Sequence, residues 1–325
     1  MEETFFEQRT DLSLLQESVE VLKKEMGKVI VGQDNMIELL LAAVLADGHV
    51  LIEGVPGIAK TLTAKLLSKS ISVGFSRIQF TPDLMPGDVI GTSVFNPRDS
   101  AFQFKPGPIF SNIVLIDEIN RAPAKTQAAL FEVMEERQIT VDGQTYHLEE
   151  PFLVIATQNP IEQEGTYHLP EAQLDRFLFK IDVTYPSAEE EFKILLHHHQ
   201  SGLDKMIHEV HSVISASDIA SLRERVRKIH VEHKLLSFIT AIVSNTRNNK
   251  SVYLGASPRA SIGILNGSKA LAAMRGRDFV TPEDIIFTAP PVLRHRIVLT
   301  PDKEMEGVST DQVIADIIHG IEIPR

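Results

Sequence analysis

Hydrophobic and polar residues follow two alternating patterns along the first 190 residues. Five short apolar runs are separated by longer stretches, several with helical periodicity; the runs are residues 49–53, 76–80, 113–117, 152–156 and 178–182. Three of the runs are nearly continuous in Val, Ile and Leu, which is typical of strands that are buried on both faces. Strands that alternate with helices predict a parallel sheet in a layered α/β fold.

Helical periodicity is clear before the first run and between the third and fourth. The first 48 residues carry two sets of apolar residues at helical spacing, namely Leu12, Leu15, Val19 and Leu22, then Met36, Leu39, Leu40, Ala43 and Val44. Residues 124–136 repeat the pattern with Leu130, Val133 and Met134 on one face. These stretches are therefore predicted to be helices.

Two insertions interrupt the alternation of strands and helices. Residues 82–110 contain five prolines and three glycines, so they cannot form one regular helix. Residues 137–148 are predicted to form a β-hairpin, because Asp142-Gly143 is a dipeptide that a type I′ turn favours.

The pattern changes after residue 186. Ser187 and Glu190 have the spacing of a capping box, and Thr281-Pro282-Glu283-Asp284 has a cap, a first-turn proline and two acids in order. From Ser187 onward the sequence predicts four to six helices and no strand before Arg294. We therefore expect an α/β domain over residues 1–186 and a helical domain over residues 187–325.

Length and composition restrict the class of protein. At 325 residues the chain is long enough for about two domains. The absence of cysteine excludes disulfides and thiolate metal sites and favours a reducing compartment. A net charge of -12 argues against a broad surface for nucleic-acid backbones. The acidic N-terminus does not resemble a signal peptide, and the longest apolar run is too short to span a bilayer, so a cytoplasmic protein is expected.

The segment that follows the first predicted strand has the composition of a phosphate-binding loop. It reads Gly54-Val55-Pro56-Gly57-Ile58-Ala59-Lys60-Thr61 and leads into a predicted helix. In such a loop the backbone N–H groups and the helix N-terminus face an anion, while the lysine neutralises phosphates and the hydroxyl binds magnesium. The strict pattern has glycine where Ala59 stands, and we expect a negative φ there, which a methyl group tolerates. The alternative is a glycine-proline turn followed by an ordinary exposed lysine.

Polar residues follow two further strands. Asp117 and Glu118 end the third strand, and Asn159 follows the fourth. Ligands of open parallel sheets bind at these carboxyl ends. One acid there can hold the water shell of magnesium, and its neighbour can deprotonate an attacking water. Alone, the acids would be read as a helix cap and Asn159 as a turn residue, but the phosphate loop upstream favours catalytic roles.

Taken together, these motifs resemble the MoxR family of AAA+ ATPases. The resemblance rests on GVPGIAKT, VLIDEINRAP, ATQNP and PEAQLDRF, which occur in the family's order and spacing. It extends from Val31-Gly32 to Ala260, nearly the whole chain. It implies a P-loop AAA+ module with a five-stranded parallel sheet, followed by an α-helical lid.

The resemblance also implies roles for individual residues. Lys60 and Thr61 match the Walker A motif, and Asp117 and Glu118 the Walker B pair. The implied nucleotide contacts are Val31 and Gly32 at the adenine, the loop from Gly54 to Leu62 (Gly54, Val55, Pro56, Gly57, Ile58, Ala59, Lys60, Thr61 and Leu62), Asp117 and Arg259. Thr61 and Asp117 would hold Mg²⁺.

Three more positions match the family's regulatory elements. Asn159 matches the first sensor, Arg176 the arginine finger and Arg259 the second sensor on the lid. Arg176 would then act in the neighbouring subunit. Residues 82–110 and 137–148 match the family's insert and hairpin, which would project toward a central pore or a client. Gln79 resembles the residue that restrains the catalytic glutamate.

The function that the resemblance implies is Mg²⁺-dependent ATP hydrolysis that drives remodelling of a protein partner. The work would be chaperone-like, in maturation or metal insertion, typically on a protein with a von Willebrand factor A domain. The chain would act as a ring, expected to be a hexamer, without nucleic acid and without inserting into a membrane.

Two other functions and several ambiguous residues stay open. The chain would otherwise be a nucleic-acid motor or transcriptional activator of a related clade, or a nucleotide-gated scaffold without useful turnover. His197-His198-His199 and the basic stretch from Arg223 to Lys228 are interpreted as solvated helix surface. Arg121 would either contact a neighbouring subunit or anchor its own loop.

Overall fold

The computed structural model describes residues 11–55, 57, 59–98, 100–159, 166–167 and 169–324. It divides the chain into two compact units. One unit runs from Leu22 to Ala220, and the other joins the chain up to Val21 with everything from Ser221 onward. The expected domain boundary after residue 186 stays a prediction; by compactness alone, the first unit continues to Ala220.

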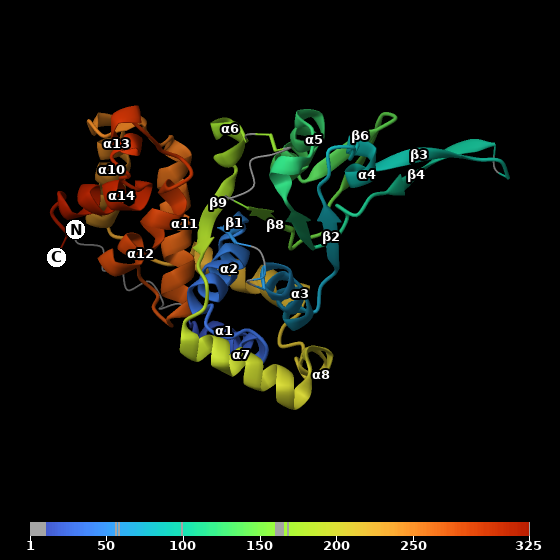
Figure 1. The fold of residues 1–325 in the computed structure, drawn as a ribbon, viewed down its shortest axis with the longest axis horizontal. Helices are drawn as coiled ribbons and strands as arrows, with labels where there is room; N and C mark the ends of the chain where they lie inside the picture. The colour runs from blue at the N-terminus through green and yellow to red at the C-terminus, as the bar shows by residue number, and fades with distance from the viewer. Residues whose placement is uncertain are drawn as a thin grey trace, which may run out of the picture. The chain divides into compact units, whose positions relative to one another are not determined.

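A five-stranded parallel sheet organises the first unit (Figure 1). Its strands are β1 (His49–Gly54), β2 (Phe75–Gln79), β5 (Ile113–Asp117), β8 (Leu153–Gln158) and β9 (Phe177–Val183). Their order is β2-β5-β8-β1-β9, so β8 lies between β5 and β1 and the carboxyl ends of these three strands are neighbours. All five predicted strands are confirmed.

Helices cover the sheet because its inner strands are apolar on both faces. Val114 and Ile116 of β5 pack with Leu130 and Met134 of α5 (Ala124–Glu136) in one buried cluster. α2 (Asp34–Ala46) packs against β1 and β9, and α3 (Lys60–Ile71) against β5. The other helical elements that lie wholly in this unit are α4 (Pro86–Ile90), the 3₁₀ turn η1 (Ile119–Arg121), α6 (Glu171–Leu174), α7 (Ala188–Ser201) and α8 (Leu203–His208).

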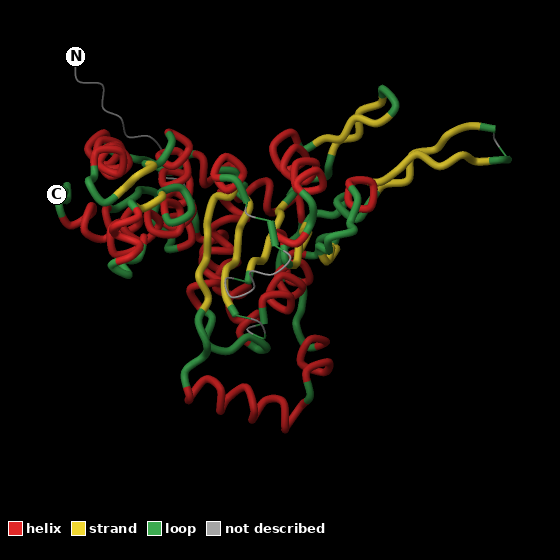
Figure 2. The backbone as a smooth tube through the Cα atoms, turned by 45° about the horizontal axis from the view of Figure 1, so that its top comes forward, coloured by secondary structure: helices red, strands yellow, loops and turns green. Residues whose placement is uncertain are grey.

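Both insertions form hairpins that extend away from the sheet (Figure 2). The first is β3 (Gly91–Asn96) with β4 (Ala101–Pro106), after α4, and the second is β6 (Gln138–Val141) with β7 (Gln144–His147). The predicted Asp-Gly turn is confirmed, with positive φ at both turn residues. The two hairpins meet: Ser93 donates a hydrogen bond to Asp142, and the rings of Phe104 and Tyr146 lie 4.5 Å apart.

The second unit is mainly helical. Its helices are α10 (His233–Asn248), α11 (Pro258–Met274), α12 (Pro282–Leu293), α13 (Pro301–Met305) and α14 (Thr310–His319), while α1 (Ser13–Gly27) and α9 (Ala216–Arg227) each run across a unit boundary. The capping boxes at Ser187 and Thr281 are confirmed.

Two expectations for this half of the chain are wrong. β10 (Val252–Leu254) is a strand before Arg294, and it pairs with β11 (Val298–Leu299). Strands of three and two residues are too short to show period-two alternation. From Ala188 on, the described residues also form eight helices rather than four to six, because helices as short as α8 and α13 give no readable periodicity. None of the helices that the structure describes combines the length and apolar character needed to cross a bilayer.

Candidate functional site

The predicted phosphate loop connects β1 to α3, and its conformation is left-handed at two positions. Gly57 has φ of +86° and Ala59 has φ of +59°. The expected negative φ at Ala59 is therefore wrong, and the strict motif's glycine has a physical reason, since a Cβ in this region costs about 1–2 kcal/mol. Lys60 begins α3 directly after this turn. Pro56 and Ile58 lie outside the described residues.

Lys60 is half-buried at the end of the loop. Its ammonium donates a hydrogen bond to the carbonyl oxygen of Gly54 at 2.6 Å, which bridges the two ends of the loop. Burial lowers the pKa of Lys60, while Asp117, Glu118 and Glu53 oppose that shift by favouring the charged form. A phosphate would act as those acids do, so the site favours an anion beside this lysine.

Asp117 ends β5 and is nearly buried. One carboxylate oxygen accepts a hydrogen bond from the Thr157 hydroxyl of β8 at 3.1 Å. The other oxygen accepts one from Nε of Arg77 on β2 at 2.6 Å. Neighbouring strands on both sides therefore fix the orientation of this acid.

Glu118 follows in a left-handed conformation, with φ of +57°. For a non-glycine residue this is strained, and such strain is concentrated at functional sites. Its backbone N–H donates to Thr157 at 3.1 Å, and its Oε2 accepts a hydrogen bond from Gln79 at 2.8 Å. Oε2 also lies 3.0 Å from Nε of Arg121. Gln79 thus contacts the glutamate at the position that the resemblance implied, and Arg121 contacts it from within the same loop.

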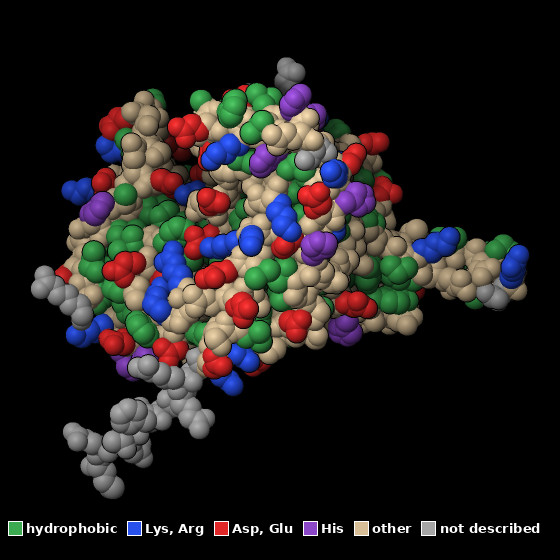
Figure 3. Space-filling view, turned by 90° about the horizontal axis from the view of Figure 1, so that it is seen from below, with side chains coloured by type: hydrophobic (Ala, Val, Ile, Leu, Met, Phe, Trp, Pro, Cys, Tyr) green, Lys and Arg blue, Asp and Glu red, His purple; other side chains and the backbone are tan. Residues whose placement is uncertain are grey.

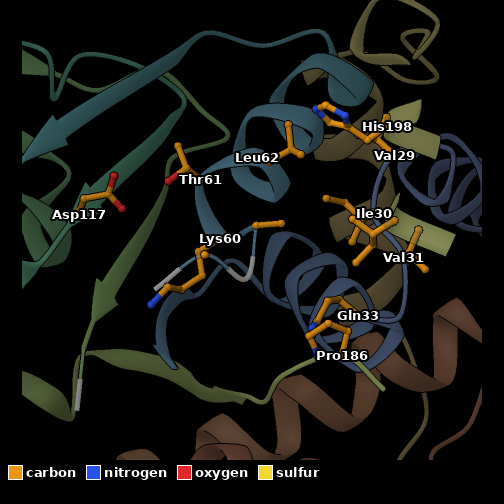
Figure 4. A pocket seen from close by; sticks show the side chains of 13 residues that line it. Val29, Ile30, Val31, Gln33, Lys60, Thr61, Leu62, Asp117, Pro186 and His198 are labelled. Atoms are coloured by element: carbon orange, nitrogen blue, oxygen red, sulfur yellow. The ribbon is translucent and has the colours of Figure 1, made fainter. Parts of the chain in front are cut away.

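A cavity of about 520 Å³ adjoins these residues (Figure 4). Lys60, Thr61 and Asp117 line one end of it, and the Thr61 hydroxyl is on the side that faces Asp117. The other end is mainly apolar and is formed by Val29, Ile30, Val31, Leu62, Pro186 and Ile194. A polar end beside a phosphate loop and an apolar end suit a molecule with a phosphate tail and a flat ring.

A second cavity, of about 210 Å³, shares the polar end of the first. Both are lined by Gly57, Lys60, Thr61 and Asp117. The second is also lined by Arg77, Gln79, Glu118, Thr157 and Asn159. The structure therefore brings the predicted Walker A lysine, both acids and Asn159 into one space.

Some predicted contacts differ from the lining that is observed. Val31 and Leu62 line the larger cavity, whereas Gly32, Gly54 and Val55 do not. Gly32 instead makes a turn, with φ of +75°, and a Cβ there would meet the carboxylate of Glu190 at 2.2–2.7 Å.

α7 also contributes to the larger cavity, which the sequence did not indicate. Ile194 and His198, four residues apart on this helix, line it together. His198 is exposed, as expected of a solvated helix, but it faces this cavity rather than only bulk solvent. Three consecutive histidines concealed this, since helical geometry aims only one of them at a given neighbour.

The oxygen donors at the polar end fit a magnesium ion. The Thr61 hydroxyl and the Asp117 carboxylate line the same space, and hard oxygen ligands are those that Mg²⁺ prefers. When bound with a nucleotide, the ion would neutralise charge on the terminal phosphates.

The two predicted arginines belong to different compact units. Arg176 lines neither cavity; its guanidinium is 3.0 Å from Glu135 and donates to the carbonyl of Phe131, both on α5. Arg259 is in the first turn of α11, in the other compact unit.

Comparison with known proteins agrees with this arrangement. The family model for the "ATPase family associated with various cellular activities (AAA)" matches residues 49–179, and that for the "AAA lid domain" matches residues 244–317. The chaperone MoxR1 of Mycobacterium tuberculosis is 45% identical over 310 residues, which cover 93% of this chain and 81% of that protein. The chain belongs to the MoxR family of AAA+ ATPases.

Two further similar proteins extend over the same length. The uncharacterized protein YeaC of Bacillus subtilis is 46% identical over 301 residues, 93% of each chain. A solved structure of a protein from Cytophaga hutchinsonii is 42% identical, with a TM-score of 0.88 over 95% of this chain and 96% of that one. The MoxR assignment therefore covers the sheet, the insertions and the helical lid together.

Proposed function

We propose that this MoxR protein hydrolyses ATP with Mg²⁺ at the cavity between the phosphate loop and the carboxyl ends of β5 and β8. The observation that carries the proposal is the placement of Glu118 and Asn159 in one cavity with Lys60 and Thr61. Hydrolysis of ATP needs a glutamate beside the terminal phosphates, whereas binding of ATP alone does not need one.

Each side chain has one task in this reaction. Lys60 offsets the charge of the β- and γ-phosphates, and the loop N–H groups bind their oxygens. Thr61 and Asp117 would hold the ion. Glu118 accepts the proton of the attacking water, and Asn159 orients that water. The apolar end of the cavity, including Val31 and Leu62, holds the adenine.

Glu118 must be released before it can act. Gln79 and Arg121 both engage Oε2 of Glu118, so both contacts hold this oxygen away from an attacking water. Hydrolysis therefore requires that at least one of these contacts loosens when the nucleotide is in place.

ATP turnover would drive the remodelling of a protein partner by a ring of subunits. The β3–β4 hairpin supports this, since its arm carries exposed Phe95 and Phe102 beside basic side chains (Figure 3). Adjoining exposed apolar side chains on a projecting element favour a protein contact, since contiguous apolar patches are typical of interaction sites. We expect maturation or metal insertion of a client with a von Willebrand factor A domain, a hexameric ring, Arg176 acting on the neighbour's nucleotide and Arg259 reporting the nucleotide state to the lid.

The proposal is tested by phosphate release from Mg²⁺-ATP. Lys60→Ala should abolish ATP binding and turnover, because the loop loses its only compensating ammonium. Lys65→Ala, five residues along the same helix and exposed, is the matched control and should retain turnover. Added DNA should leave the rate unchanged. Equal turnover in the Lys60→Ala variant and the parent would refute the proposal, and strong stimulation by DNA would favour a nucleic-acid motor.

A further inference from the structure

Arg77 is an arginine in the phosphate cavity that the motifs do not explain. It lies on β2, two residues before Gln79, so both side chains leave the same face of this edge strand. Gln79 reaches Glu118, and Arg77 reaches Asp117. One strand face therefore holds both acids of the site.

The contact with Asp117 uses only a part of the guanidinium. Nε donates to Asp117 at 2.6 Å, while the side chain as a whole is 52% exposed. Within the part of the chain that the structure describes, no hydrogen bond or ion pair engages the two terminal nitrogens. A guanidinium has five N–H donors, so four of them are available to another acceptor.

The acceptor that these donors suit is an anion in the same cavity. Arg77 lines the smaller cavity together with Lys60, Thr61 and Asn159, and not the larger one that ends at the apolar residues. Because Arg77 does not line the apolar end, we expect it to contact the outermost phosphate of a nucleotide rather than the adenine ring. Asp117 also has a contact that is independent of Arg77, because Thr157 donates a hydrogen bond to its other oxygen.

We propose that Arg77 is a γ-phosphate-binding residue in cis, which holds Asp117 through Nε and the γ-phosphate through its terminal nitrogens. The inference rests on the proposed ATP site and deepens it. It means that ATP and ADP are distinguished within one subunit, before any neighbour contributes. A planar guanidinium presents its donors to two acceptors in one fixed geometry, which the compact ammonium of a lysine does not reproduce.

Equilibrium binding of ATP and ADP with Mg²⁺ tests this, measured in a Glu118→Gln background that prevents turnover. Arg77→Gln and Arg77→Lys should each lower the affinity for ATP by about tenfold or more, the loss expected for a charge-assisted hydrogen bond. Each should lower the affinity for ADP by less than about twofold. The control variant Arg227→Gln removes an exposed arginine on α9 and should change neither the affinity for ATP nor the affinity for ADP. Retained ADP affinity shows that a variant is folded; if Arg77→Gln does not fold, Arg77→Lys gives the same test.

Three results would overturn the inference. Equal weakening of ATP and ADP would make Arg77 only a brace for Asp117, and unchanged affinities would remove it from the site. Failure of the Glu118→Gln parent itself to bind either nucleotide would refute the proposed function, and that failure is distinguishable because Arg77 is intact in the parent.

Discussion

Ala59 shows what a single methyl group does in a phosphate loop. It has φ of +59°, where an L-residue is strained and glycine is not. Ala59→Gly should therefore raise the free energy of unfolding by about 0.5–1 kcal/mol, the relief of strain less the extra entropy of an unfolded glycine. Denaturant unfolding measures the change.

The control for this substitution is an alanine with ordinary helical geometry. Ala128 is exposed in the middle of α5. Ala128→Gly should lower the free energy of unfolding by about 0.5–1 kcal/mol, as glycine does in a helix. If Ala59→Gly and Ala128→Gly lowered the free energy of unfolding by comparable amounts, the backbone strain inferred at Ala59 would be contradicted.

The sequence identified those residues of the site that local pattern determines. Lys60, Asp117 and Glu118 were predictable because a buried strand is readable and its end is fixed by the strand itself. Arg77 and His198 were not, since their roles depend on which strand neighbours β5 and on where α7 passes the cavity. Strand order and helix placement are tertiary properties that one segment does not encode.

At the scale of elements, the β3–β4 hairpin depends on a close approach at its base. Gly91 has φ of +103°, and a Cβ there would lie 2.3 Å from the carbonyl oxygen of Lys105. Gly91→Ala should therefore detach the paired strands, so their backbone N–H groups exchange hydrogen faster while those of β5 keep their protection. Hydrogen exchange with peptide resolution measures this.

Gly87→Ala is the matched control for the hairpin. Gly87 is in α4, and a Cβ there would have its nearest neighbour, Thr92, at 4.0 Å. This substitution should leave exchange in β3 and β4 unchanged. Slow exchange in the hairpin of the Gly91→Ala variant would show that the base tolerates a side chain.

The turn sequences of the two hairpins explain why the β6–β7 hairpin was predicted and the β3–β4 hairpin was not. Asp142-Gly143 supplies a turn signal that is sufficient by itself. Residues 82–110 show prolines and glycines but no two-residue turn signal, so the sequence excluded one regular helix over the whole segment without indicating the β3–β4 pairing.

For the whole molecule, the position of Arg176 bears on assembly. Its guanidinium is bound to Glu135 and Phe131 on α5, and it lines neither cavity of its own subunit. If it acts on a neighbour's nucleotide, Arg176→Ala protein and Lys60→Ala protein should each be inactive alone but regain turnover when mixed. A finger in trans contributes a rate factor of about 10³ to 10⁵, so the recovery is measurable by phosphate release.

The control for mixing pairs Arg176→Ala with the Arg176→Ala, Lys60→Ala double variant. That mixture contains no intact arginine at position 176, and it should stay inactive. Lack of recovery in the first mixture, with subunit exchange demonstrated, would show that Arg176 does not act between subunits.

The central claim is that Glu118 performs hydrolysis in a site that Lys60 and its loop form for ATP. Recovery of bound nucleotide from Glu118→Gln protein tests it most directly, with Glu132→Gln, an exposed acid on α5, as the control. After incubation with Mg²⁺-ATP, the Glu118→Gln protein should retain intact ATP and turn over at least about 10²-fold slower, the contribution of a general base. The parent and the control should yield ADP. ADP formed at the parent rate by the Glu118→Gln protein would contradict the account.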